Sequence, residues 1–225
     1  MTFIVITGYM RSSVIIYHKN HDKYPKKWID DFVISIQNQV VVEYDVIELD
    51  YGGNSEQIYP ESKFFSFDIA EIPLPNGRHN GHSEAHNWCC RKAVELGYDF
   101  VFNTNIDDLY HYERLSRQLI KMQEGYDVVS CNYSIINEAN QITRKDVLFS
   151  EMDIHEQAAK NHNIISHPGC VYSKKFIEKS GLLRQEEVPK DDFELWKRSY
   201  KKFKFFIVPY TLMYYRVHES NVSKR

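Results

Sequence analysis

The sequence predicts an α/β protein with a mostly parallel central sheet that helices cover on both faces. Short apolar runs rich in β-branched and aromatic residues alternate with longer segments of helical periodicity, and several of these runs end at glycine or acidic residues. Such alternation favours parallel pairing, because each helix returns the chain to the same edge of the sheet. The length of 225 residues fits one domain, residues 1–225.

The composition describes a globular chain and excludes several classes of protein. Hydrophobic residues make up 43% and aromatic residues 14% of the sequence, which is enough material for a buried core. Lys and Arg number 28 against 31 Asp and Glu, so the net charge of −3 gives no cationic surplus for nucleic-acid phosphates. No apolar run reaches the ~18 residues of a membrane helix. We expect no nucleic-acid partner and no integral membrane segment.

The cysteines favour a reducing compartment. They are Cys89, Cys90, Cys131 and Cys170. Their spacing matches no disulfide framework, and the neighbours Cys89 and Cys90 make a poor mutual pair. Residues 3–7, although apolar, lack the basic leader of a signal peptide. We therefore expect reduced thiols and a cytoplasmic protein.

The first fifty residues predict a strand, a helix and a second strand. Residues 3–7 form a short buried strand that Gly8 ends. The i, i+3, i+4, i+7 spacing of an amphipathic helix follows at Ile29, Phe32, Val33 and Ile36. Residues 44–49 are the next strand, which stops at the polar, glycine-rich turn that begins with Asp50.

The same pattern continues to residue 131. Residues 83–96 predict a helix, with Ser83 as its N-cap and Gly97 just past its end. A second helix ends near Gly125 and carries its apolar stripe at Leu115, Leu119 and Met122. The expected strands are residues 63–67, 98–102 and 128–131.

The alternation breaks beyond about residue 135. The polar segment 137–146 predicts a loop, and residues 173–180 predict a short helix closed by Gly181. Another helical stripe follows at Phe193, Trp196 and Tyr200. The aromatic segments 204–208 and 211–217 are expected to pack on the sheet as strand or loop.

Acidic residues follow two predicted strands, at the edge where open α/β sheets bind their ligands. One is Asp50; the other group is Asn105-Ile106-Asp107-Asp108, directly after the strand at 98–102. Hard oxygen ligands of this kind suit Mg²⁺ or Mn²⁺, which would bridge the protein to a diphosphate. Asp107 and Asp108 also suit the cap of the following helix, and the spacing does not decide between the two interpretations.

A second acidic pair, Asp191 and Asp192, opens the last predicted helix. The helix dipole favours carboxylates there whatever their function. A carboxylate beside a cleft also suits a general base that takes a proton from a substrate hydroxyl. The sequence alone leaves both interpretations open.

A histidine- and cysteine-rich segment is a candidate zinc site. Its members are His79, His82, His86, Cys89 and Cys90. No further pair elsewhere completes four ligands, so burial of Cys89 in the core is the preferred interpretation. The dinucleotide-binding, P-loop and hydrolase-elbow motifs are absent, which argues against those enzyme classes.

Several further segments follow one another in a distinctive order. They are Thr7-Gly8-Tyr9-Met10-Arg11, Asp31-Phe32-Val33-Ile34-Ser35-Ile36-Gln37-Asn38-Gln39, Ile47-Glu48-Leu49-Asp50-Tyr51-Gly52-Gly53, Gly81-His82-Ser83-Glu84-Ala85-His86-Asn87, the run from Asn105 to Asp108, the acceptor-side segment His167-Pro168-Gly169-Cys170-Val171-Tyr172-Ser173-Lys174-Lys175, Asp191-Asp192-Phe193-Glu194-Leu195-Trp196-Lys197-Arg198, and Tyr214-Tyr215-Arg216-Val217-His218-Glu219-Ser220-Asn221-Val222-Ser223. Together they resemble the motifs of family 2 glycosyltransferases, which have the GT-A fold. The sequence departs from these motifs at Gly8 and Met10, at His86 where arginine is usual, and at Asn105 in place of the first acid.

The resemblance implies an inverting, metal-dependent glycosyltransferase of the hexosyltransferase type. Residues 1–108 would bind a nucleotide-sugar donor, and residues 109–225 a carbohydrate or other hydroxyl acceptor. Asp192, with Asp191 beside it, would be the catalytic base, and Asp107 with His218 would hold Mn²⁺ or Mg²⁺. The implied donor-binding residues are Thr7, Tyr9, Arg11, Asp50, His86, Asn105, Asp107 and Asp108.

Two alternatives stay open at this point. An inactive relative would bind carbohydrate or nucleotide-sugar without transferring it, and Asn105 in place of an acid is compatible with that reading. A sugar nucleotidyltransferase would share the sheet and the acidic site. It usually carries a longer glycine-rich basic loop than Gly8-Tyr9-Met10-Arg11.

Overall fold

The computed structural model describes residues 10–19, 21–69, 72–73, 79–147, 149–150, 154, 162–219 and 221. The strand expected at residues 3–7, and with it Thr7 and Tyr9, lies outside the described residues. Among those residues no helix combines the length and the apolar character that crossing a bilayer requires.

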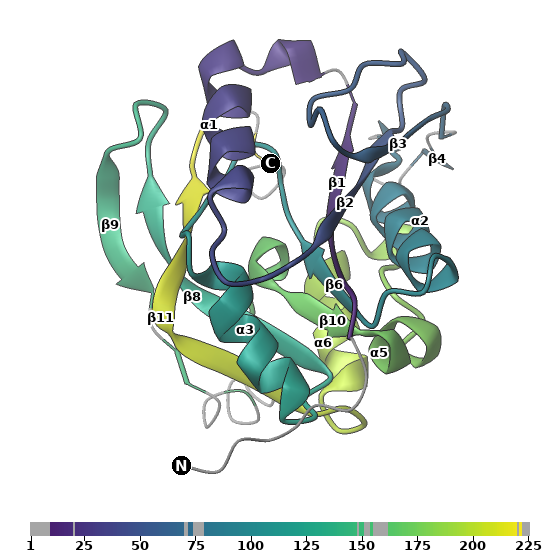
Figure 1. The fold of residues 1–225 in the computed structure, drawn as a ribbon, viewed down its shortest axis with the longest axis vertical. Helices are drawn as coiled ribbons and strands as arrows, with labels where there is room; N and C mark the ends of the chain where they lie inside the picture. Colours follow the sequence, from purple (N-terminus) through teal and green to yellow (C-terminus); the bar gives the residue numbers. More distant parts are fainter. Residues whose placement is uncertain are drawn as a thin grey trace.

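A curved, mostly parallel sheet of nine strands forms the centre of the described chain (Figure 1). Its strands are β1 (Ser12–His18), β2 (Asp45–Asp50), β3 (Lys63–Ser66), β6 (Phe100–Asn103), β7 (Leu109–Tyr110), β8 (Val128–Ile136), β9 (Ile142–Val147), β10 (Val171–Ser173) and β11 (Phe205–Arg216). Their order is β3-β2-β1-β6-β10-β8-β11-β7, with β9 paired to β8. The short strands β4 (Ile72–Pro73) and β5 (His79–Asn80) form a separate pair.

The strand directions confirm the predicted α/β class. β1 pairs in parallel with both β2 and β6, β2 with β3, and β8 with β11. β10 runs antiparallel between β6 and β8, so it joins the two parallel parts of the sheet. The carboxyl ends of β1, β2 and β6 therefore meet at one edge, where a ligand site is expected.

Helices cover both faces of this sheet. They are α1 (Lys26–Gln37), α2 (His82–Glu95), α3 (Arg114–Gln123), α5 (Lys174–Lys179) and α6 (Asp191–Ser199). Val14 and Ile16 of β1 face one core, with residues of α1 and α3, whereas Ile15 and Tyr17 face the other, with residues of α2, α5 and α6. Because successive side chains of a strand point to opposite faces, β1 is buried throughout.

The first described strand, β1, lies where the sequence analysis predicted no strand. β1 begins at Ser12, and its apolar centre is only Val14 to Tyr17 because two serines and a histidine flank it. All seven of its residues are nevertheless buried. Arg11 therefore precedes a strand instead of following one, which places it at the opposite edge of the sheet from the carboxyl ends.

The polar segment 137–146 was expected to be a loop, and this prediction is wrong in part. Residues from Ile142 onward form β9, which pairs with β8 through a tight turn at Asn137–Asn140. Thr143, Arg144 and Lys145 are exposed, so this strand lacks the apolar alternation that identifies half-buried strands. The segments 204–208 and 211–217 join into β11, with an irregularity between Val208 and Thr211.

Candidate active site

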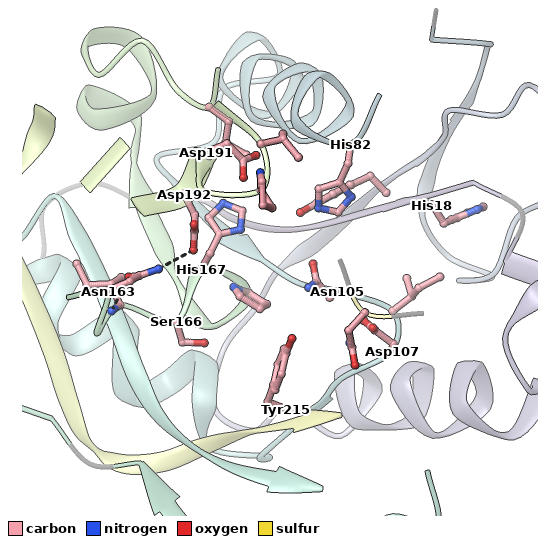
Figure 2. A pocket seen from close by; sticks show the side chains of 18 of the residues that line it. His18, His82, Asn105, Asp107, Asn163, Ser166, His167, Asp191, Asp192 and Tyr215 are labelled. Carbon is pink, nitrogen blue, oxygen red and sulfur yellow. Dashed lines mark hydrogen bonds between the residues drawn. The ribbon is translucent and has the colours of Figure 1, made fainter. Parts of the chain in front are cut away.

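A cavity of about 570 Å³ opens at the carboxyl ends of β1 and β6 (Figure 2). The end of β1 contributes His18, and the segment after β6 contributes Asn105 and Asp107. The second half of the chain contributes residues 163–168 and, at the start of α6, Asp191 and Asp192. The two acidic groups singled out in the sequence thus share one cavity.

Asp107 lies in the wall of the cavity, beside His218 from the last motif of the chain. Its Oδ2 is 3.0 Å from Nε2 of His218. Arg216, at the end of β11, donates from Nε to the carbonyl oxygen of Asp107 at 2.7 Å. The turn after β11 is closed by Asn221, whose Oδ1 accepts the His218 N–H at 2.6 Å. Backbone contacts therefore fix both partners.

The two other polar residues of this motif, Asn105 and Asp108, have different environments. Asn105 lines the cavity, and its Oδ1 is buried without a hydrogen-bond partner. Asp108 is 1% exposed and does not line the cavity; its Oδ1 accepts the N–H of Arg216 at 2.9 Å. Burial and the negative charge of Asp107 raise the pKa of Asp108 well above its ordinary value. Asp108 thus lies behind the cavity wall, where its hydrogen bond to the backbone of Arg216 stabilises the segment that carries Asp107.

The pair of Asp107 and His218 fits a divalent cation that is shared with substrate oxygens. Mg²⁺ and Mn²⁺ sites commonly use one or two carboxylates, with substrate phosphates and water completing the coordination shell. The described part of the chain holds no group of three or more His, Cys, Asp or Glu side chains arranged for a metal. A cation at Asp107 would therefore depend on ligand oxygens, and the candidate zinc set around His82, His86 and Cys89 is not assembled.

Asp192 is held at the start of α6, on the other side of the cavity. Its Oδ1 accepts the N–H of Phe193 at 2.7 Å, and its Oδ2 accepts the amide of Asn163 at 3.0 Å (Figure 2). Burial and the neighbouring Asp191 raise the pKa of Asp192 to about 6. A carboxylate with this pKa is ionised at neutral pH and is still basic enough to accept a proton.

Asp191 connects α6 to the start of α2. Its Oδ2 accepts the Ser83 hydroxyl at 2.6 Å. The preceding residue of α2, His82, lines the cavity, and Figure 2 shows its ring between the acidic groups on the two sides. Burial lowers the pKa of His82, although the charges of Asp191 and Asp107 oppose this effect. An uncharged imidazole therefore stands between the acids.

Asp50 caps a turn beside the cavity. Its Oδ1 accepts the N–H of Gly52 at 2.9 Å, and its Oδ2 lies 3.4 Å from the N–H of Glu56. Burial alone would raise the pKa of Asp50, but these N–H donors outweigh it and lower the pKa. Tyr51, the next residue, lines the cavity instead.

Four of the expected donor-binding residues do not line the cavity: Asp50 and Asp108, described above, and Arg11 and His86. Arg11 lies at the amino end of β1, where its guanidinium reaches Asp45 at 3.5 Å. His86 is fully buried under the cavity wall, with its Nδ1 3.2 Å from Oδ1 of Asn87. Arg11 is remote from the cavity because it directly precedes β1, whose carboxyl end is at His18. His86 is one helical turn further into α2 than His82.

His18, which ends β1 and lines the cavity, was not among the site residues predicted from the sequence. Its Nε2 is 2.9 Å from Oε1 of Glu48 on β2, and both side chains are fully buried. Glu48 also accepts hydrogen bonds from the N–H groups of Ile58 and Tyr59 and from the hydroxyl of Ser62. A histidine directly after an apolar run was the available signal, but this run was not identified as a strand.

Known proteins share the fold of this chain. No family model matches the sequence. The O-antigen biosynthesis glycosyltransferase WbnJ of Escherichia coli is 23% identical over 220 residues, which cover 94% of this chain and 82% of that protein.

Solved structures with the same fold include TarS residues 1–349 from S. aureus in complex with UDP-GlcNAc, which matches with a TM-score of 0.68 and 15% identity. The match covers 96% of this chain and 61% of the TarS chain. The mannosyltransferase PcManGT from Pyrobaculum calidifontis, in complex with GDP-Man and Mn²⁺, has a TM-score of 0.63 and 16% identity, with 97% and 60% covered. The chain thus spans about three fifths of the length of these solved chains.

Fold and cavity together define the class: this is a chain with the GT-A-type glycosyltransferase fold. The fold class predicted from the sequence is confirmed, and the sequence similarity to a curated glycosyltransferase extends over nearly the whole chain.

Proposed function

We propose that this chain is a glycosyltransferase that moves a sugar from a nucleoside diphosphate sugar to an acceptor hydroxyl in glycan synthesis. The observation that carries the proposal is the position of Asp107 and Asp192 in the wall of one cavity. One side offers a carboxylate and an imidazole for a cation and phosphates. The other offers a carboxylate suited to an incoming alcohol.

Asp107 and His218 would hold Mn²⁺ or Mg²⁺ on the donor side. When bound, the cation would neutralise the charge that develops on the departing diphosphate. Asn105 adds an unpartnered amide oxygen to the same wall, where it can accept a hydrogen bond from the donor. Support for nucleotide-sugar donors comes from the ligands of the solved neighbours, which are UDP-GlcNAc and GDP-Man.

Asp192 acts as the general base on the acceptor side. It takes the proton from the acceptor hydroxyl as that oxygen attacks the anomeric carbon, while the bond to the diphosphate oxygen breaks on the opposite face. This single displacement inverts the configuration of the transferred sugar. The raised pKa of Asp192, about 6, supports the role because the group accepts a proton readily near neutral pH.

The two halves of the chain divide this work. In this proposal residues 1–108 supply most of the donor side and residues 109–225 the acceptor side, except that His218 returns to the donor side. Family 2 membership rests on the motif order, and a cytoplasmic location on the four cysteines, all of which are buried and free.

A donor panel tests the proposal directly. UDP- and GDP-linked sugars are screened by thermal shift with and without Mn²⁺, because a ligand that binds only the native state raises its apparent stability. Release of nucleoside diphosphate is then measured with candidate glycan acceptors. Donor binding with acceptor-dependent release is expected. Binding without any release indicates an inactive relative, and release of pyrophosphate from a nucleoside triphosphate and a sugar phosphate indicates a nucleotidyltransferase.

A further inference from the structure

We propose that His167 donates a hydrogen bond from Nε2–H to a hydroxyl oxygen of the sugar that is transferred, and that Asn103 fixes the imidazole tautomer needed for this contact. The inference rests on the proposed sugar transfer and adds to it a residue that contacts the transferred sugar directly. His167 follows the segment 163–166 in the cavity wall, and Asn103 is the last residue of β6.

The orientation of the Asn103 amide is determined by its surroundings. Nδ2 of Asn103 lies 3.0 Å from the carbonyl oxygen of His167, which can only accept. The nitrogen of the amide must therefore be on this side. Oδ1 then faces the hydroxyl of Tyr17 at 3.2 Å, and that hydroxyl can donate to it. Both ends of the amide are satisfied in this orientation and in no other.

The same amide sets the tautomer of His167. Nδ2 of Asn103 also lies 3.2 Å from Nδ1 of His167. Because Nδ2 is a donor, Nδ1 must be the acceptor and carries no proton. The proton of the neutral ring is therefore on Nε2. Burial and the nearby His82 lower the pKa of His167 to about 3, so the ring stays neutral at physiological pH.

The resulting Nε2–H has no hydrogen-bond partner among the described residues. His167 is only 8% exposed, and a buried N–H without a partner costs free energy that a ligand can recover. Aromatic rings hold the imidazole in place: its centroid lies 5.9 Å from that of Trp196 and 4.8 Å from that of His86. The donor is thus oriented before any substrate arrives.

His86 shows by contrast what a purely structural histidine looks like in this core. Asn87 donates from Nδ2 to the carbonyl of Leu183 and accepts its N–H at Oδ1, so the orientation of that amide is also determined. Nδ1 of His86 must then donate to Oδ1 of Asn87. Its Nε2 lies 3.6 Å from Sγ of Cys90, which can donate to it. Both nitrogens of His86 are used, whereas Nε2 of His167 is not.

The position of His167 indicates which part of the substrate it meets. The diphosphate binds on the Asp107 side, and the acceptor hydroxyl approaches Asp192, so the sugar ring must lie between them. His167 and Asp192 both line the cavity, and in the view of Figure 2 they are seen on one side of it, with Asn105 and Asp107 on the other. A donor here is suited to a sugar hydroxyl oxygen, since a hydrogen bond donated to the attacking oxygen itself would weaken its nucleophilicity.

Binding measurements on matched ligands test this contact. UDP-GlcNAc and GDP-mannose are compared with UDP and GDP in the presence of Mn²⁺, for the wild type, His167→Phe and His167→Gln. For the donor that the wild type binds, His167→Phe should weaken affinity about five- to tenfold and leave the affinity for the free diphosphate unchanged. His167→Gln retains an N–H donor near the position of Nε2 and should recover most of the loss.

The outcomes separate the two proposals. If the wild type binds a nucleotide-sugar and His167→Phe binds it equally well, the contact with the sugar is contradicted. The same holds if His167→Phe weakens the affinity for the free nucleoside diphosphate as much as the affinity for the nucleotide-sugar. In both cases the proposal of sugar transfer is unaffected. If the wild type binds no nucleotide-sugar of the panel, the proposed function fails, and the sugar contact fails with it.

The tautomer has its own readout, independent of substrate. Long-range ¹H–¹⁵N spectra of the labelled protein should show Nε2 protonated and Nδ1 unprotonated for His167 from about pH 5.5 to about pH 8. Asn103→Ala should let the second tautomer appear. A wild-type spectrum with the proton on Nδ1, or with both nitrogens protonated in this range, would overturn the assignment.

Discussion

Nε2 of His218 lies 3.0 Å from Oδ2 of Asp107, although 111 residues separate the two in the sequence. The ring of Trp28, on α1, packs against the imidazole with centroids 5.1 Å apart. The contact is therefore supported from three parts of the chain: the segment after β6, the turn after β11 and a helix.

Asp107→Asn and His218→Ala should each weaken donor binding in the presence of Mn²⁺, by about tenfold or more. If both side chains hold the same cation, the double variant should lose little beyond the larger single loss, because the two effects share one cause. Calorimetric titration with and without Mn²⁺ measures this. Fully additive losses, or equal losses without the metal, would show that the two residues do not act through a cation.

Asp192→Asn should reduce turnover by about 10²- to 10⁴-fold and leave donor affinity nearly unchanged, since the amide cannot accept the hydroxyl proton. Glu194→Gln, on the same helix, is the matched control and should keep wild-type turnover. In the wild type, turnover should fall as the pH drops below about 6, where Asp192 becomes protonated. A pH profile that is flat across this range would exclude Asp192 as the base.

The same carboxyl also affects stability. Its folded-state pKa, about 6, is raised above that in the unfolded chain. The folded state therefore binds this proton more tightly, and the contribution of Asp192 to the free energy of unfolding decreases as the pH rises from about 4 to about 7. Relative to the wild type, Asp192→Asn should gain up to about 3 kcal/mol between pH 4 and pH 8. Urea unfolding at both pH values measures the difference, and a constant difference would contradict the raised pKa.

Glu48→Ala should destabilise the fold by about 3 to 5 kcal/mol. The substitution removes the carboxylate that contacts buried His18, and it leaves the N–H groups of Ile58 and Tyr59 and the hydroxyl of Ser62 without their acceptor. Glu43→Ala, at an exposed position just before β2, should change stability by less than about 0.5 kcal/mol. Chemical unfolding of the two variants gives the comparison. Similar midpoints for both would show that Glu48 is not needed for folding.

The thiols should be unreactive in the native protein. All four cysteines are free and buried, and burial raises the pKa of each thiol above its ordinary value. A thiol-specific chromogenic reagent should therefore label almost none under native conditions and all four after denaturation. Rapid labelling of one thiol in the folded protein would contradict its burial.

Periodicity was sufficient for the elements whose two faces differ in polarity or whose apolar run is unbroken. Helices α1 and α2 and strands β2 and β6 lie close to their predicted positions. β1 escaped detection because Ser12, Ser13 and His18 are polar residues that the fold buries, and burial of a polar side chain depends on partners elsewhere in the chain. β9 escaped detection because an exposed edge strand needs no apolar face.

The site could be predicted only in part for a related reason. Asp107, Asp192 and His218 carry chemistry that their own residue types reveal, and the structure brings them to the cavity or into contact with its wall. The segment that begins at His167 resembles an acceptor-side motif, but the tautomer proposed for His167 depends on an amide 64 residues away, and no local pattern contains that information. Arg11 is the converse case, because it was expected to follow a strand and it directly precedes β1 instead.

The pairing of Asp107 with His218 also sets an order of events during synthesis. When Asp107 leaves the ribosome, the strands β3, β2, β1 and β6 have already been translated and can begin to assemble, yet the histidine that completes the contact is 111 residues behind. Any ion affinity that needs both side chains is thus withheld from the nascent chain.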